Sequence, residues 1–127
     1  MPPRRRTAPQ EGRAALSRAL ASPDPAHADV GTATRFLLEE LGARAPGRSV
    51  EVRVPPYGAV QCVSGPRHTR GTPPSVVETD AATWIALACG TLRWADAEAT
   101  GRLHASGERS DLSPYLPLVR DETQPRG

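Results

Sequence analysis

The side chains best suited to chemistry lie in one proline- and glycine-rich stretch, SGPRHTRGTPPS at residues 64–75. Arg67 and Arg70 carry guanidinium groups that can form paired hydrogen bonds to a carboxylate or a phosphate, and His68 lies between them. The GxxxxGK signature of a P-loop is absent, so an anion site would depend on these side chains and on loop amides. We therefore treat Arg67, His68 and Arg70 as a candidate anion-binding loop. The alternative is that the arginines pair with acids of the same domain and stiffen a long connection.

The other polar residues form no recognisable catalytic or metal-binding motif. His27, His68 and His104 are far apart, and none has a Cys, Asp or Glu partner at a metal-ligand spacing. The sequences VSGP around Ser64 and HASG around Ser106 do not fit the GxSxG turn of a serine nucleophile. We expect no catalytic residue, no metal and no cofactor, and we expect the protein not to be an enzyme.

The two cysteines, Cys62 and Cys89, have no CxxC spacing and predict no disulfide framework. Cys62 falls within a predicted strand, where burial would raise the pKa of its thiol. We expect both to be reduced, small hydrophobic side chains of the core. The longest apolar run, from Trp84 to Cys89, is about six residues, far short of the roughly 20 that cross a bilayer. We expect no membrane span and a cytoplasmic location.

The net charge of +2 arises at the N-terminus, where four arginines (Arg4, Arg5, Arg6 and Arg13) stand against Glu11. The rest of the chain is close to neutral. A nucleic-acid-binding domain needs a basic stripe on folded elements, with aromatic platforms if it binds single strands. Aromatic residues make up only 4% of this chain. We therefore expect no nucleic-acid partner.

Hydrophobic spacing predicts two helices in the first third of the chain. One covers residues 10–21, and the second begins after Asp29, which is suited to the N-cap position. The apolar residues on one face of the second helix are Val30, Ala33, Leu37 and Leu41. The pattern is typical of a helix that is half buried against a core.

Opposite charges at a spacing of four residues occur twice on the second predicted helix. Arg35 precedes Glu39, and Glu40 precedes Arg44. Residues four apart are neighbours on a helix surface, so both pairs are expected to form ion pairs. This pattern is typical of a solvent-exposed face and indicates structure rather than chemistry.

The middle and end of the chain predict four strands. Residues 49–54 alternate strictly, and the turn PPYG at 55–58 leads into a returning strand at 59–63, which together predict an antiparallel hairpin. A short third strand is expected at 76–77 and a fourth at 102–106. The hairpin is the clearest local prediction.

Helical segments are predicted between and after the last two strands. Asp80 is placed to cap a helix that Gly90 ends, and a short helix at 94–100 ends at Gly101. Two prolines limit residues 111–118 to a single turn of helix.

Two stretches of this pattern resemble the sterol carrier protein superfamily, in particular its small actinobacterial-type members. They are TDAATWIALACGTLRWADAEATGRLHASGERSDLSPYLPL, from Thr79, and RSVEVRVPPYGAVQCVSGPRHTRGTPPSVVETD, and together they cover about 70 residues. The resemblance implies a single domain of α/β (α+β) class, with a twisted, mainly antiparallel sheet of about four to five strands and helices on one face. We assign residues 11–118 to this domain, between a disordered basic tail at 1–10 and a disordered polar tail at 119–127.

The resemblance also implies a function. Superfamily members bind fatty acids, fatty acyl-CoA, sterols or phospholipids in an apolar tunnel between sheet and helices. Candidate lining residues in this sequence are Phe36, Leu37, Leu41, Val52, Val54, Trp84, Leu87 and Leu103. Larger lipid carriers close the tunnel with a C-terminal helix, which Pro114 and Pro117 break here, so a small cavity or none is favoured over a site for a long-chain lipid or sterol.

Two other functions remain open at this point. The domain could be an accessory or protein-interaction module that fills its interior with its own side chains, because plain core packing demands the same residues. It could also be the companion domain of a thiol-dependent enzyme, as in some relatives, and lend an arginine such as Arg67 or Arg70 to the active site of that enzyme.

Overall fold

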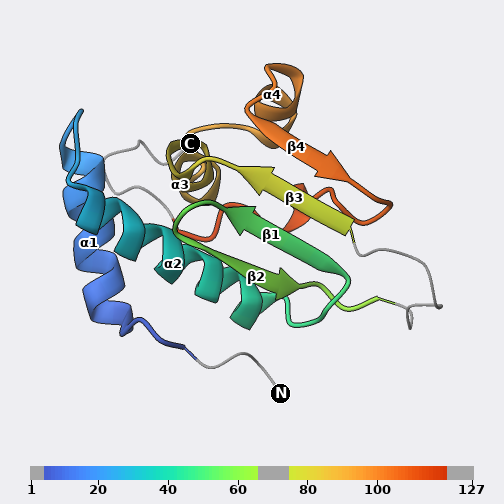
Figure 1. Ribbon diagram of the computed structural model, residues 1–127, viewed down its shortest axis with the longest axis horizontal. Coiled ribbons are helices and arrows are strands. Elements are labelled where there is room, and N and C mark those ends of the chain that lie inside the picture. The colour runs from blue at the N-terminus through green and yellow to red at the C-terminus, as the bar shows by residue number, and fades with distance from the viewer. Residues whose placement is uncertain (1–4, 66–74, 120–127) are drawn as a thin grey trace.

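A computed structural model describes residues 5–65 and 75–119 of the chain (Figure 1). In chain order the elements are α1 (Pro9–Ala21), α2 (His27–Arg44), β1 (Val50–Val54), β2 (Gly58–Cys62), β3 (Ser75–Thr79), α3 (Ala81–Cys89), α4 (Trp94–Ala99), β4 (Leu103–Ser106) and η1 (Ser113–Tyr115), the last a single 3-10 turn. The fold is α+β, as predicted. The short turn at the C-terminal end also agrees with the limit that the two prolines impose.

The four strands form one open, mixed sheet in the order β2-β1-β3-β4. β1 pairs antiparallel with β2, which confirms the predicted hairpin, and β3 pairs antiparallel with β4. The central pair, β1 with β3, is parallel. β2 and β4 are therefore the edge strands, and β2 leaves one side of its backbone free of strand partners within the sheet.

The sheet buries one face and exposes the other. Val50, Val52 and Val54 of β1 are completely buried, whereas Arg53 between them is exposed and Glu51 is half-buried. Successive side chains of a strand point to opposite faces, so this pattern identifies the covered side. Helices α2 and α3 lie behind that side of the sheet in Figure 1, and α2 crosses beneath β2.

Close packing of helix on helix completes the core. A Cβ atom on Gly12 of α1 would lie 2.3 Å from Cγ of Phe36 on α2, so the glycine allows this ring to pack against α1. Trp84 of α3 is almost fully buried, and its indole N–H donates to the carbonyl oxygen of Thr34 at 3.3 Å. These contacts tie α1 and α3 to α2, which is the central helix of the molecule.

The helix termini agree with the sequence in one case and differ in another. Asp80 caps α3 as predicted, with its Oδ1 accepting the N–H of Thr83 at 2.7 Å, and Gly90 ends the helix with a φ of 80°. Asp29 was expected to be the N-cap of α2, and this prediction is wrong because the N-cap is Ala26, three residues earlier, and the helix begins at His27. Asp29 lies in the first turn, where a carboxylate is favourable to the helix dipole, and it accepts a hydrogen bond from Arg18.

Candidate functional site

A groove of about 1470 Å³ runs along the edge strand β2, above α2. Helix α2 contributes Thr32, Arg35, Leu38 and Glu39, and the hairpin contributes the five residues from Tyr57 to Gln61. The N-terminal segment and the start of α1 add Arg6, Thr7 and Glu11, and the connection after α2 adds Pro46, Gly47 and Arg48. The groove is open to solvent and lies between sheet and helix.

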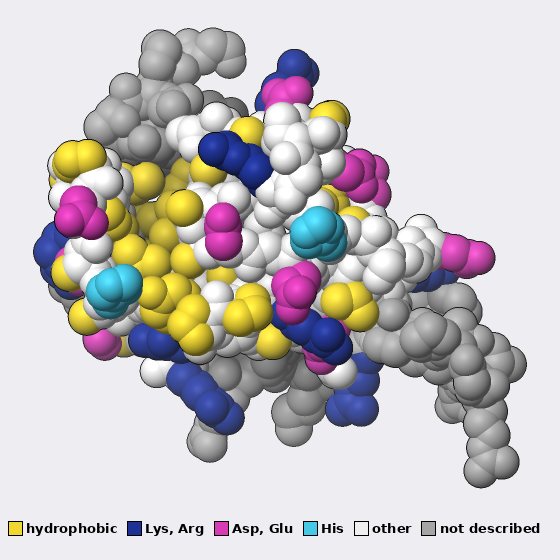
Figure 2. Space-filling view, turned by 45° about the horizontal axis from the view of Figure 1, so that its top comes forward, with side chains coloured by type: hydrophobic (Ala, Val, Ile, Leu, Met, Phe, Trp, Pro, Cys, Tyr) yellow, Lys and Arg dark blue, Asp and Glu magenta, His cyan; other side chains and the backbone are white. Residues whose placement is uncertain are grey.

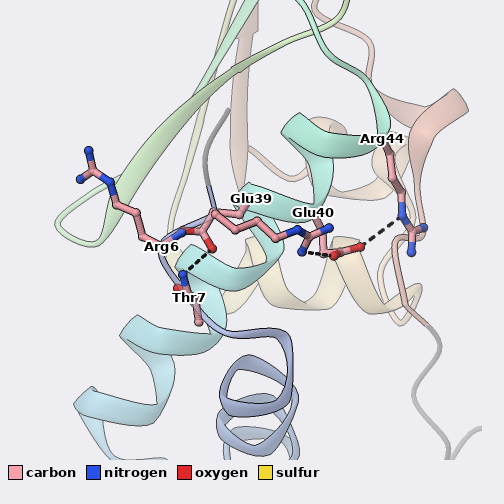
Figure 3. A network of polar contacts seen from close by, with 6 residues as sticks. Arg6, Thr7, Glu39, Glu40 and Arg44 are labelled. Atoms are coloured by element: carbon pink, nitrogen blue, oxygen red, sulfur yellow. Dashed lines mark hydrogen bonds and ion pairs between the residues drawn. The ribbon is translucent and has the colours of Figure 1, made fainter. Parts of the chain in front are cut away.

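The N-terminal segment is held on α2 by two acids (Figure 3). Oε1 of Glu39 accepts the backbone N–H of Arg6 at 2.9 Å, and Oε2 accepts that of Thr7 at 3.1 Å. Glu40 forms ion pairs with Arg5 and, at 3.3 Å, with Arg44. Three interactions therefore fix residues 5–7 along the helix, and the segment forms one wall of the groove.

These contacts decide which of the two predicted ion pairs on α2 forms. The pair of Glu40 with Arg44 is confirmed. Arg35 does not pair with Glu39, because backbone amides occupy that carboxylate, and it has no acidic partner among residues 5–65 and 75–119. An exposed guanidinium is thereby left on the groove wall.

The hairpin turn docks closely on α2 beside this arginine. A Cβ atom on Gly31 would lie 2.9 Å from Cδ1 of Tyr57 and 3.2 Å from Nη1 of Arg35, so the glycine makes room for both side chains. The hydroxyl of Tyr57 lies 3.4 Å from Nδ1 of His27. One end of the groove therefore combines an aromatic ring with a guanidinium group.

The floor of the groove is apolar. Leu38 is only 2% exposed and belongs to the main hydrophobic core, and Val60 is half-buried and packs against that core. Both also line the groove, and of the two Val60 is the more exposed, so it supplies the accessible apolar surface there. Such a site has an apolar wall and a cationic rim, and it is chemically suited to a molecule with one apolar and one anionic or polar end.

The eight residues predicted to line a tunnel are found in the interior. Each is at most 2% exposed, and none lines the groove. Six of them, Phe36, Leu37, Leu41, Val52, Val54 and Trp84, belong to the main core cluster, and Leu87 and Leu103 belong to a smaller cluster with Ala97. Their role as ligand-lining residues stays a prediction.

The groove residues that sequence reasoning missed are Arg35, Leu38, Tyr57 and Val60. Val60 falls in the predicted strand at 59–63 and Tyr57 in the predicted turn at 55–58, and Arg35 was expected only as an ion-pair partner. The only local signal for this packing was Gly31. Its lack of a side chain leaves room on the helix surface but does not indicate which residue fills it. The candidate anion-binding loop of Arg67, His68 and Arg70 lies outside the described residues.

The cysteines behave as buried side chains. Cys62 is fully buried, and burial raises the pKa of its thiol to about 11, in the direction expected from the sequence. Cys89 is also buried and not disulfide-bonded. Within the described ranges, no three His, Cys, Asp or Glu side chains gather in a way that could hold a metal ion.

The surface carries charges of both signs. Figure 2 shows acidic, basic and histidine side chains interspersed on one face, while hydrophobic side chains gather in a hollow toward one end. In the part of the chain that the structure describes, no helix has both the length and the apolar character that crossing a bilayer requires. Apolar surface is thus accessible on a molecule whose described helices do not span a membrane.

Comparison with known proteins places most of this architecture in one family. The family model described as bacterial SCP ortholog matches residues 26–118. The match includes α2 and β2, which form two walls of the groove, and it leaves out α1 and the N-terminal segment. No curated protein matches the chain.

Proposed function

The chain belongs to the family of bacterial sterol carrier protein (SCP) orthologs, and from this membership we propose that it is a non-enzymatic carrier domain for a small amphipathic ligand. The ligand class is a fatty acid, an acyl-CoA or another lipid. The observation that carries the proposal is the groove, which joins the apolar side chains of Leu38 and Val60 to the arginines of its rim.

The physical argument follows from the two kinds of surface in the groove. Each methylene group that leaves water for an apolar wall contributes about 0.8 kcal/mol, so an alkyl chain gains most where Leu38, Val60 and Tyr57 lie. A polar end placed at the rim stays hydrated and within reach of guanidinium groups. The groove therefore supports binding of an amphiphile without displacement of the packed core.

A second candidate function is an accessory module that binds an extended protein segment. One observation favours it, namely that β2 is an edge strand whose free side borders the groove. Unpaired strand edges can accept an additional strand from a partner. The groove would then hold a peptide in place of a lipid.

The experiment compares ligand binding by two charge insertions that differ only in position. Val60→Glu places a carboxylate on the groove wall, and Val76→Glu places one on the open face of β3, where the valine is also half-buried. Native mass spectrometry of detergent-free protein, with titration of dodecanoate, measures binding. We expect the wild type and Val76→Glu to take up the fatty acid and Val60→Glu to lose at least about tenfold in affinity, since a charge in an apolar site is costly. A wild-type mass that titration leaves unchanged would refute the carrier function, and equal loss in both variants would refute the location.

A further inference from the structure

We propose that Arg35 fixes an anionic group of the ligand in the groove, and that the N-terminal segment, residues 5–7, keeps Arg35 available by engaging Glu39. This inference rests on the proposed function, because it assigns the ligand class and its recognition within the same groove. The ligand class is an alkyl chain that ends in a carboxylate or a phosphate.

The first step concerns the competition for Glu39. On a helix surface Glu39 would be the neighbour of Arg35, four residues away. In the folded protein both of its carboxylate oxygens accept backbone N–H groups, from Arg6 at 2.9 Å and from Thr7 at 3.1 Å. Figure 3 shows the segment lying along α2 while the guanidinium of Arg6 extends away from Glu39. The acid that would neutralise Arg35 is therefore occupied.

The second step concerns the placement of Arg35. The position of a Cβ atom on Gly58 lies 3.6 Å from Cγ of Arg35 and equally far from Cδ1 of Leu38, so the stem of the arginine follows the turn into the groove. Its Nη1 lies at the gap that Gly31 leaves, next to the ring of Tyr57. The stem thus packs on protein while the side chain as a whole is exposed. A partly immobilised guanidinium loses less freedom when it binds an anion through two parallel hydrogen bonds.

The third step concerns charge. The groove is lined by three arginines, Arg6, Arg35 and Arg48, and by two acids, Glu11 and Glu39. Glu39 is engaged by backbone amides and does not pair with Arg35, so this guanidinium is complementary to an incoming carboxylate or phosphate. The apolar part of the groove begins at Leu38. Apolar side chains can therefore contact the alkyl end of a ligand while arginine contacts its anionic end.

The first test measures the affinity of the full chain for dodecanoate, dodecyl phosphate and dodecanol by isothermal titration calorimetry. The three probes share one alkyl chain and differ only in the polar end. We expect each anion, or one of them, to bind at least about tenfold more tightly than the alcohol, as a charge-assisted hydrogen bond predicts. The anion that binds more tightly shows whether Arg35 recognises a carboxylate or a phosphate. Arg35→Gln should reduce this preference to about onefold.

The matched control for that variant is Arg93→Gln. Arg93 is also exposed and has no acidic partner among the described residues, and it precedes α4, outside the groove. We expect it to keep the wild-type preference. A preference that survives Arg35→Gln, or that falls equally in Arg93→Gln, would refute the role of Arg35.

The second test removes the amide donors of the N-terminal segment. A variant with Arg6→Pro and Thr7→Pro lacks both N–H groups that bind Glu39. We expect Glu39 then to pair with Arg35 and the anion preference to fall severalfold, and we expect the further change Glu39→Gln to restore it. Arg6→Ala, which keeps the amide but removes the guanidinium, is the control and should fall less. An unchanged preference in the double proline variant, or no rescue by Glu39→Gln, would refute the role of the segment.

The outcomes separate the two proposals. Equal affinity of the wild type for the anions and the alcohol would refute this inference and leave the carrier function intact. Failure of all three probes to bind to folded protein would refute the carrier function itself. Circular dichroism of each variant establishes that it is folded.

Discussion

Two threonines of the core differ in what their hydroxyl groups do. Among the described residues, Thr34 on α2 is completely buried and its Oγ1 has no hydrogen-bond partner. Thr79 at the end of β3 is 5% exposed, and its Oγ1 donates to the carbonyl oxygen of Arg102 at 2.8 Å. Burial of an unpaired hydroxyl destabilises the folded state by the free energy of desolvation of that group. A hydrogen-bonded hydroxyl instead stabilises the folded state by about 1 kcal/mol.

Replacement of each threonine by valine should therefore change the free energy of unfolding in opposite directions. Thr34→Val should raise the free energy of unfolding by about 1 kcal/mol, and Thr79→Val should lower it by about the same amount. Urea denaturation followed by circular dichroism measures both values. If Thr34→Val destabilised the protein as much as Thr79→Val does, the hydroxyl of Thr34 would have a partner after all.

The contacts of single residues are also the feature that the sequence predicts least well. The pattern of residues 59–63 places Val60 in a strand but does not show that its side chain also lines a groove. Arg35 was assigned an acid four residues away, and the assignment failed because two amides from residues 6 and 7 take that acid. Contacts between distant segments decide both cases, and no local pattern encodes them.

Among the elements, α1 depends on one glycine. Gly12 lies inside the helix, where alanine ordinarily stabilises by about 1 kcal/mol, yet a Cβ atom there would come within 2.3 Å of Phe36. The ring is 1% exposed, so it has little room to move away. Steric exclusion therefore outweighs helix propensity at this position.

The corresponding prediction is that Gly12→Ala destabilises the protein by about 1–3 kcal/mol, as overpacked core positions do. Ser17→Ala, on the exposed side of the same helix, should have an effect of no more than about 0.5 kcal/mol. Thermal and urea unfolding of both variants provides the comparison. A stabilising effect of Gly12→Ala would mean that α1 and α2 separate easily.

Elements were the scale at which the sequence was most informative. The alternation of valines predicted β1, the PPYG turn predicted the hairpin, and Asp80 with Gly90 marked both ends of α3. The start of α2 was wrong by three residues because Asp29 is equally favourable in the first turn of a helix and at its N-cap. The parallel pairing of β1 with β3 depends on how the chain returns across the sheet, which residue types alone do not specify.

For the whole molecule, the lack of lysine has a consequence at alkaline pH. The chain has 16 arginines and no lysine, so few groups titrate between pH 9 and 11, and Cys62 is one of them. Its pKa is raised from 9.0 to about 11 by burial. In the unfolded chain the thiol loses its proton first, so the stabilising effect of the neutral buried form is complete below pH 9 and is lost as the pH rises through 11.

The free energy of unfolding should therefore decrease from about pH 9 upward, and Cys62→Ala should reduce this slope. Guanidinium denaturation at a series of pH values gives the slope for each protein. The comparison is one of slopes, because loss of the sulfur atom also lowers stability at neutral pH. Identical slopes would show that the Cys62 thiol does not control alkaline stability.

The contact of Gly12 with Phe36 also bears on where the folding unit begins. The region shared with the family starts at residue 26, yet Phe36 inside it packs against a helix that precedes it. The family match therefore begins at residue 26, whereas the packed core extends further toward the N-terminus, into α1. An expression fragment cut at the border of similarity would divide the hydrophobic core, so the helix before it has to be kept in any minimal version of the protein.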